Sequence, residues 1–230
     1  MTIWYQLVPR QGGGDLATKK KETLCFTDDP LADLPPRRHA ILAAAFAVLM
    51  EQGYAGASTL EIASRAKVSK RELYAEFGSK AGILEALIAT TAARMQAPLD
   101  LPRVVDRRSL ADTLTRYGIR ALTELSHPAV TAINRLAAAE AGGGSEIGKI
   151  LDRAGREPNR LALGRLMAQA QAAGLLANDD ADRMSGEFFS LLFGDLPMRL
   201  MLGVVEPPDA REIARRTKSA VDAVLRLHSA

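Results

Sequence analysis

Cationic and hydroxyl side chains gather at residues 69–77, where their spacing suits chemistry with a polyanion. Ser69 is followed by Lys70 and Arg71, and Tyr74 lies one helical turn later. Arginine presents two N–H donors that match the two acceptors on the major-groove edge of guanine. The free N–H groups at a helix start also attract phosphate. The residue types and their order therefore predict a contact with DNA.

Two serines define the helices that must position these cations. Ser58 precedes Glu61 by three residues and Ser69 precedes Glu72 by three, which is the spacing of a capping box. The two helix starts lie eleven residues apart, with the turn Ala66–Val68 between them. This order predicts a helix-turn-helix, whose second helix enters the major groove.

Positive charge is concentrated in the same segment. Between Arg37 and Lys80 lie seven Lys or Arg residues and four Glu residues, so the local net charge is +3, equal to that of the whole chain. A single capping box indicates only a helix start, and a Lys-Arg pair on a helix usually faces solvent. The prediction of DNA binding therefore depends on the joint order of these residues.

The segment from Gly53 to Lys80 contains a series of motifs in a fixed order: Gly53-Tyr54, Ser58, Ile62-Ala63, Ala66–Lys70, Leu73-Tyr74 and Phe77–Lys80. Together they resemble the N-terminal domain of TetR/AcrR-family transcriptional regulators. The resemblance implies an all-α fold of about nine helices, a homodimer formed by the last two, a palindromic operator, and release by a small molecule. It also implies which residues contact DNA: phosphate contacts from Ser58, Ser69, Tyr74 and Lys80, and groove positions for Lys70 and Arg71. With Thr59 and Lys67, these form the predicted DNA-binding set.

Two positions depart from the usual pattern of that family. Lys67 stands where glycine is common, and a left-handed backbone there would cost about 1 kcal/mol for a residue with a side chain. Glu76 stands where many members carry a bulkier or basic residue. It would either repel a phosphate or accept a hydrogen bond from a cytosine amino group. We expect this protein to differ from its relatives at these two residues.

The remaining chain has helical periodicity and no run of alternating β-branched residues. We expect an all-α protein with three parts: a flexible extension at 1–33, a helix-turn-helix domain at 34–84, and a helical ligand-binding and dimerisation domain at 85–230. The extension contains Lys19–Lys21, so a basic arm that reaches DNA phosphates is the alternative to a flexible tail.

The expected ligand-binding and dimerisation domain has weaker signals. Residues Arg135–Ala141 are similar to the regulatory domain of the AefR-like subgroup. Apolar helices at 179–203 and 208–228 favour a four-helix interface between two copies over burial within one chain. The expected interface residues are Phe193, Leu196, Leu200, Ile213, Val221 and Val224. The expected pocket residues are Tyr117, Arg120, Arg135, Met167, Phe188 and Phe189, with ordinary core packing and an Arg135–Glu140 pair as the alternative.

Other kinds of site lack the residues they need. Cys25 is the only cysteine and the three histidines are scattered, so we expect no disulfide, metal or cofactor. Gly143–Lys149 partly fits a phosphate-binding loop, but Ile150 replaces the Ser or Thr that binds magnesium. No signal peptide or membrane span is evident. We expect a cytoplasmic, nucleoid-associated repressor and not an enzyme, with an architectural DNA-binding protein that has no inducer as the alternative class.

Overall fold

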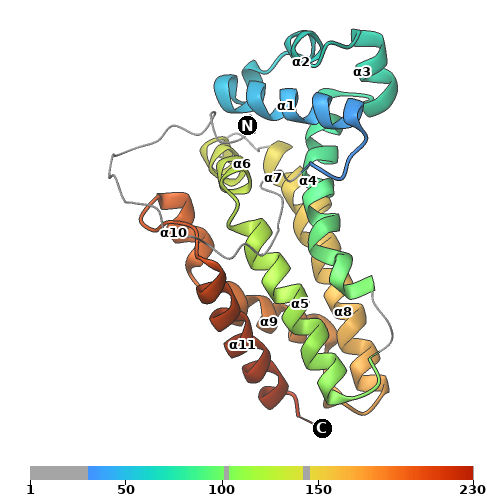
Figure 1. Ribbon diagram of the computed structural model, residues 1–230, viewed down its shortest axis with the longest axis vertical. Coiled ribbons are helices and arrows are strands. Elements are labelled where there is room, and N and C mark those ends of the chain that lie inside the picture. The colour runs from blue at the N-terminus through green and yellow to red at the C-terminus, as the bar shows by residue number, and fades with distance from the viewer. Residues whose placement is uncertain (1–30, 101–103, 142–145, 230) are drawn as a thin grey trace, which may run out of the picture. The chain divides into compact units, whose positions relative to one another are not determined.

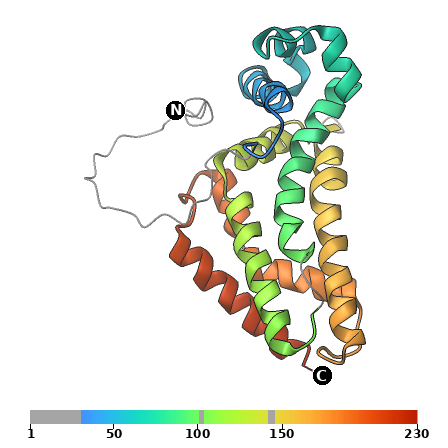
Figure 2. The same ribbon diagram turned by 45° about the vertical axis from the view of Figure 1, so that its right-hand side comes forward.

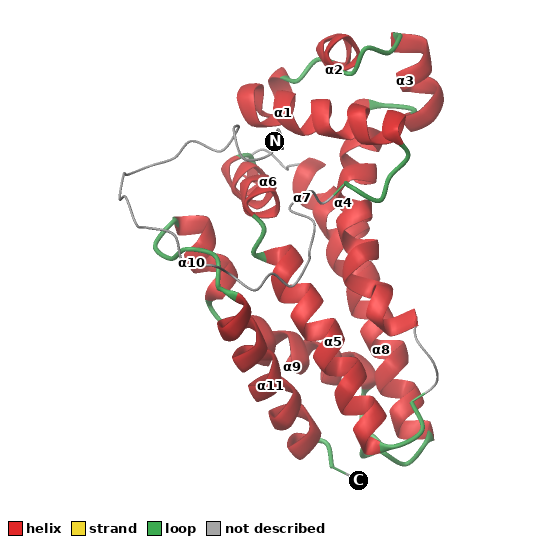
Figure 3. Cartoon of the chain, in the orientation of Figure 1, coloured by secondary structure: helices red, strands yellow, loops and turns green. Residues whose placement is uncertain are grey.

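The computed structural model describes residues 31–100, 104–141 and 146–229, and the regular elements there are helices, besides one isolated bridge between Leu176 and Ser229 (Figures 1 and 3). The expected all-α class is confirmed. The chain divides into two compact units, Met1–Ile83 and Leu84–Ala230. Residues 1–30 of the expected extension lie outside the described residues, and so do residues 143–145 of the partial phosphate loop.

The Met1–Ile83 unit packs two short helices against a long one. Ile62 and Ala63 from the first short helix, and Leu73 and Phe77 from the second, are buried as the sequence predicts. The nine consecutive residues Ile41–Leu49 of the long helix are buried as well, since the removal of apolar surface from water is favourable. The long helix is interrupted at Gly53, which has a φ of 69°. The helices are α1 (Pro36–Gly56), α2 (Thr59–Arg65), α3 (Lys70–Phe77) and the start of α4 (Lys80–Gln96).

The Leu84–Ala230 unit is a bundle built around buried aromatic and aliphatic side chains. Tyr117 and Phe188 are fully buried in its core. Helices α5 and α11 run side by side against α9 (Figures 1 and 2). After α4 come the 3₁₀ helix η2 (Ala97–Asp100), α5 (Arg107–Leu125), α6 (Pro128–Ala139), α7 (Glu146–Ile150), the π-helix η4 (Leu151–Arg156), α8 (Glu157–Ala172), α9 (Ala181–Phe193), α10 (Leu196–Leu202) and α11 (Ala210–Leu227).

Two long helical stretches of the larger unit are interrupted. Between α7 and α8 lies the π-helical stretch Leu151–Arg156, which ends just before Pro158. Proline has no N–H to donate, so the regular hydrogen-bond ladder is broken at this position. The expected helix at 179–203 divides into α9 and α10 at Gly194, whose φ is 51°. Glycine adopts this left-handed conformation readily, and the turn ends α9.

Candidate nucleic-acid interface

Helix α3 begins with a complete capping box. The Ser69 hydroxyl accepts from the Glu72 N–H at 3.2 Å, and the Glu72 carboxylate accepts from the Ser69 N–H at 2.8 Å. Arg37 from α1 adds an ion pair to Glu72 at 2.7 Å. The Ser69 backbone N–H, the Ser69 hydroxyl and Arg37 together hold the pKa of Glu72 below its ordinary value. The start of α3 is therefore fixed by hydrogen bonds and tied to α1.

Helix α2 has only half of its expected capping box. The Ser58 hydroxyl accepts from the Leu60 N–H at 3.2 Å, but Glu61 turns away and pairs with Arg65 at 2.7 Å. Arg65 also forms a two-pronged pair with Glu51 of α1, both contacts at 2.7 Å. This pairing holds the pKa of Glu51 below its ordinary range. The prediction of a box at Ser58 was wrong because arginine donors compete better for Glu61.

The turn between α2 and α3 places a lysine in a left-handed conformation. Lys67 has a φ of 55° and is the only residue besides glycine with a positive φ in the described part of the chain. The Val68 N–H donates to the Ala63 carbonyl and the Lys67 N–H to the Ser64 carbonyl, which is the Schellman pattern that ends a helix. Glycine usually occupies this position because it has no Cβ to strain.

The exposed cations of this unit that form no ion pair with a described residue lie on α3 and the turn before it. Lys67, Lys70 and Arg71 are exposed, and none of them forms an ion pair with a residue that the structure describes. The Lys70 ammonium lies 5.7 Å from the centre of the Tyr74 ring. Arginine and lysine at the first turn of such a helix can meet base edges and phosphates.

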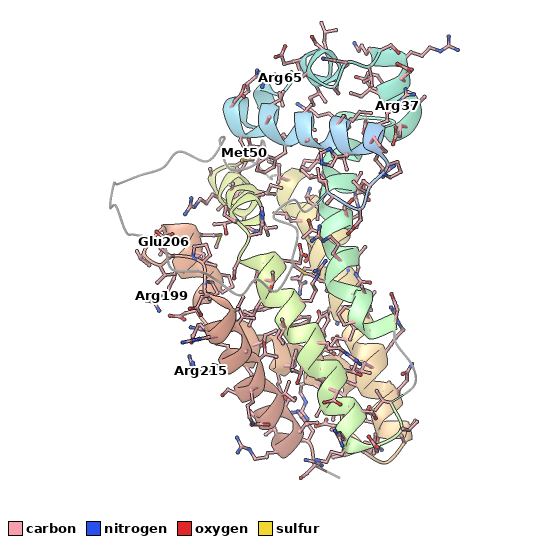
Figure 4. All side chains as sticks on the ribbon, viewed as in Figure 1. Arg37, Met50, Arg65, Arg199, Glu206 and Arg215 are labelled. Carbon is pink, nitrogen blue, oxygen red and sulfur yellow. The ribbon has the colours of Figure 1, made fainter. Side chains whose placement is uncertain are left out.

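The four acidic residues of the same segment are all paired with arginines. Glu72 pairs with Arg37, as described above, and Glu76 pairs with Arg38 at 3.1 Å. Glu51 and Glu61 share Arg65. Figure 4 shows Arg37 beside α3 and Arg65 at the other side of the unit. The carboxylate of Glu76 is thus engaged with α1, which weakens both roles considered for it at a DNA surface. The uncompensated positive charge remains at the turn and on α3.

Two hydroxyl groups join α2 to α3. The Thr59 hydroxyl lies 3.1 Å from the Tyr74 hydroxyl, and either can donate. Whichever group donates, the pair keeps one further O–H donor, because each hydroxyl carries one hydrogen. Tyr74 is 39% exposed, so this donor can reach a phosphate at the surface.

Lys80 occupies a position that its sequence context did not reveal. Its ammonium donates to the carbonyls of Tyr54 at 2.7 Å, Ala57 at 3.2 Å and Ala55 at 3.4 Å. It also lies 4.6 Å from the centre of the Tyr54 ring. Three carbonyls take up the three donors of an ammonium group. In this conformation Lys80 caps the end of α1, and the predicted phosphate contact would require it to leave these partners.

The Leu84–Ala230 unit contains a mostly apolar cavity of about 600 Å³. Of the expected pocket residues, Tyr117 and Phe189 line it. Met167 and Phe188 are fully buried in the core instead. Arg120 pairs with buried Glu124 at 3.0 Å. Arg135 donates to the carbonyls of Leu200 and Met201, both at 2.7 Å, and does not line the cavity.

The sequence missed the largest group of cavity residues. They lie along α7, η4 and α8 at helical spacing: Gly148, Leu151, Asp152, Gly155, Arg156, Asn159 and Arg160. Spacings of three and four residues place side chains on one helix face, and this signal was present in the sequence. It was hidden because two members are glycines and three are charged, so the face is not a continuous apolar stripe.

Five of the six expected dimer residues are buried within one chain. Ile213, Val221 and Val224 belong to the core that α11 forms with α5 and α9. Leu196 and Leu200 are also buried there, whereas Phe193 is half-buried beside the cavity. The five buried residues offer no free apolar surface to a partner. The amphipathic spacing of α11 correctly indicated a covered face, but α5 and α9 of the same chain cover it.

Two further classes of site find no support in the described residues. No three His, Cys, Asp or Glu side chains gather there as metal ligands. No helix in the same ranges is long and apolar enough to cross a membrane.

Two protein-family models match the chain. Residues 41–87 match bacterial regulatory proteins of the tetR family. Residues 112–230 match the C-terminal domain of the AefR-like transcriptional repressor. The first match contains the recognition turn and α3, and the second contains most of the cavity wall.

Solved structures are similar to the chain over nearly their full length. A TetR transcriptional regulator from Agrobacterium tumefaciens is 32% identical, with 85% of this chain and 96% of that chain covered and a TM-score of 0.70. The flavonoid-responsive regulator FrrA is 27% identical, with 84% and 97% covered and a TM-score of 0.66. A protein from Mesorhizobium loti shares the fold at 21% identity, with 84% and 97% covered and a TM-score of 0.66. No curated protein matches the chain significantly.

Proposed function

The chain belongs to the TetR family of DNA-binding transcriptional regulators, and on this premise we propose that it is a homodimeric repressor released from a palindromic operator by a small molecule. One observation carries the DNA-binding part. Lys67, Lys70 and Arg71 are exposed without ion pairs in the described chain, while the four neighbouring carboxylates are paired with arginines. This arrangement offers a polyanion a patch of positive charge. Such a protein acts where the bacterial chromosome is, in the cytoplasm.

The cavity supports an inducer. A volume of about 600 Å³ is within the range of pockets that hold drug-sized molecules. An architectural DNA-binding protein has no need for such a cavity, so this observation favours the inducible repressor. Helix α4 contains Lys80 at its start and the cavity residues Leu87, Ile88 and Met95 further along. A ligand that moves these cavity residues would act on the helix that also caps α1.

We assign the dimer contact to the exposed apolar face of α9 and α10, in place of the covered residues. Leu191, Met198 and Leu202 are 45%, 55% and 67% exposed. Met198 and Leu202 lie four residues apart on one side of α10, and Leu191 lies near the end of α9, before the turn at Gly194. A two-fold axis would bring this face against its own copy and bury it.

Sedimentation of a Met198→Glu, Leu202→Glu variant tests the assignment. The charges should split the dimer, because a buried unpaired carboxylate is costly. Leu161→Glu on α8 is the matched control, since Leu161 is an exposed leucine outside this face. A double variant that stays dimeric, or a control that becomes monomeric, would contradict it.

The function is tested by selecting genomic DNA fragments on the purified full chain and sequencing what is retained. The proposal expects a few fragments with a shared inverted repeat, whose half-sites lie one helical turn or somewhat more apart. Retention of many unrelated fragments would favour the architectural class, and no retention would overturn the proposal. Fragments selected in this way then serve as the operator in the measurements below.

A further inference from the structure

We propose that the cavity of the Leu84–Ala230 unit takes a flat, uncharged aromatic compound with hydrogen-bonding substituents. This inference deepens the proposed function, since such a compound would be the inducer. Three properties of the cavity lead to it: an aromatic wall, side-chain-free strips of backbone, and charges that are already paired.

The aromatic wall comes from α5 and α9. The rings of Phe189 and Phe193 are nearly parallel, with a 9° angle between their planes and centres 5.6 Å apart. The Tyr117 ring lies 6.2 Å from that of Phe189. All three residues line the cavity. Aromatic faces bind other aromatic rings in offset or edge-on arrangements, beyond the effect of buried area. The wall therefore favours a ring system over a flexible aliphatic chain.

Glycines leave parts of the cavity wall without side chains. Gly148 and Gly155 lie seven residues apart on the α7–η4 stretch, and Gly186 lies on α9. A Cβ added to Gly155 would come within 3.1 Å of the Ile88 side chain, so Ile88 fills the space in front of this glycine. A Cβ added to Gly186 would meet no atom within 4 Å, so a side chain there would take up open space. At Gly186, therefore, bare backbone allows close approach of a flat ring face.

The charged residues of the cavity wall have partners in the protein. Arg156 pairs with Asp152 at 2.6 Å. Arg160 pairs with Glu157 at 2.8 Å and with Asp182. An anionic ligand would have to compete with these carboxylates for the arginines, and a cationic ligand would find Asp152 already neutralised. The wall thus favours a ligand with no net charge.

Asparagines provide polar groups for the ligand's substituents. Asn134 donates one N–H to the Val130 carbonyl at 2.8 Å, which leaves its second N–H and its carbonyl oxygen for a ligand. Asn159 is more fully used, since it donates to the Gly155 carbonyl at 2.9 Å and accepts from the Tyr117 hydroxyl at 3.4 Å. The structure assigns Asn134 as the residue that recognises a hydroxyl or carbonyl group on the ring system.

Titration calorimetry on the full chain without DNA tests this inference. The probes are trans-resveratrol, a planar uncharged polyphenol, dodecanoate, an anionic aliphatic chain, and ethidium, a cationic aromatic. The inference expects trans-resveratrol to bind more tightly than the other two. Tighter binding of dodecanoate or ethidium, or no binding of trans-resveratrol, would overturn it. Because DNA is absent, this result does not depend on whether the selection of genomic fragments succeeds.

Two substitutions connect the binding to the cavity. Gly186→Leu should abolish measurable binding of trans-resveratrol by filling open space, while Ala168→Leu, on the exposed surface of α8, should leave it unchanged. Asn134→Leu should weaken binding about tenfold, the usual result of losing one hydrogen bond to a ligand. Thermal unfolding confirms that each variant is folded. Unchanged affinity in both Gly186→Leu and Asn134→Leu would place the probe elsewhere and overturn the inference.

Discussion

The hydroxyl of Thr59, at the start of α2, lies 3.1 Å from the hydroxyl of Tyr74 on α3. This contact joins the two helices of the helix-turn-helix at their exposed side. It also restrains both side chains, so whichever O–H donor remains can bind a phosphate with less loss of side-chain freedom.

Tyr74→Phe is expected to weaken binding to operator and unrelated DNA alike, by about threefold to tenfold, because it removes a donor to the backbone and no base contact. Fluorescence anisotropy on both DNAs measures the change. Thr59→Val keeps the Tyr74 hydroxyl but removes its hydrogen-bond partner, so it should weaken DNA binding less than Tyr74→Phe does. A loss confined to the operator would show that Tyr74 reads bases instead.

Lys67→Gly should change stability and DNA affinity in opposite directions. Glycine relieves the left-handed strain at φ 55°, so the free energy of unfolding should rise by up to about 1 kcal/mol. Loss of the charge should weaken DNA binding. If Lys67 contacts a phosphate, it should also reduce the salt slope, which is the slope of the logarithm of the binding constant against the logarithm of salt concentration, by about one unit. Lys67→Ala is the control, since it removes the charge and keeps the strain. Equal stability of the Gly and Ala variants would contradict the account of the turn.

Lys80→Met distinguishes helix capping from phosphate contact. The apolar stem stays while three hydrogen bonds to α1 carbonyls are lost, so the free energy of unfolding should fall by about 1–2 kcal/mol. Capping alone predicts an unchanged salt slope for DNA binding. A salt slope reduced by about one unit, with an unchanged free energy of unfolding, would show that Lys80 contacts a phosphate instead. Lys149→Met, at an exposed lysine of α7, controls for loss of one charge.

Glu72 should make the stability of the Met1–Ile83 unit depend on acid. Its pKa in the folded chain is below the ordinary value of 4.5, because Ser69 and Arg37 favour the carboxylate. The stabilisation is therefore fully present above the unfolded pKa and is lost as the pH falls below 4.5 through the folded pKa. Denaturant unfolding from neutral to acid pH should show that the free energy of unfolding falls less for Glu72→Gln than for the parent protein. Glu206→Gln, at an exposed residue of the other unit, should behave as the parent does.

Gly118 allows α5 and α11 to approach closely. A Cβ added there would come within 2.7 Å of the Thr217 methyl carbon, so Gly118→Ala should lower the free energy of unfolding by about 1–3 kcal/mol. Thr217→Ser removes that methyl group and should restore part of the loss in the double variant. Chemical denaturation of the two single variants and the double variant measures the coupling. Strictly additive losses would show that the strain lies elsewhere.

Local features of the site were predictable from the sequence, whereas those that depend on distant residues were not. The Ser69–Glu72 box joins residues three apart, and the strain at Lys67 was expected from the resemblance, because glycine is common at that position. The carbonyls that hold Lys80 could not be predicted, because they lie more than twenty residues earlier in the chain. Glu61 left its expected cap for Arg65, and that choice depends on where α1 places Glu51.

The same distinction explains the errors in the larger unit. The spacing of Ile213, Val221 and Val224 correctly indicated one apolar face on α11. Periodicity does not show whether the same chain or a second copy covers that face. In the structure, α5 and α9 of the same chain cover it. The exposed leucines and methionine of α9 and α10 were mixed with buried neighbours in one apolar run, so only three-dimensional burial separates them.

We propose that α3 reads DNA sequence through Arg71. The most direct measurement is the ratio of affinities for the selected operator and a scrambled duplex, at one fixed salt concentration. For Arg71→Ala the ratio should fall by about tenfold or more, the usual contribution of one arginine–guanine contact. Arg211→Ala, which removes an exposed arginine from α11, should leave the ratio unchanged. A ratio that survives in Arg71→Ala would contradict the assignment of α3 as the reading helix.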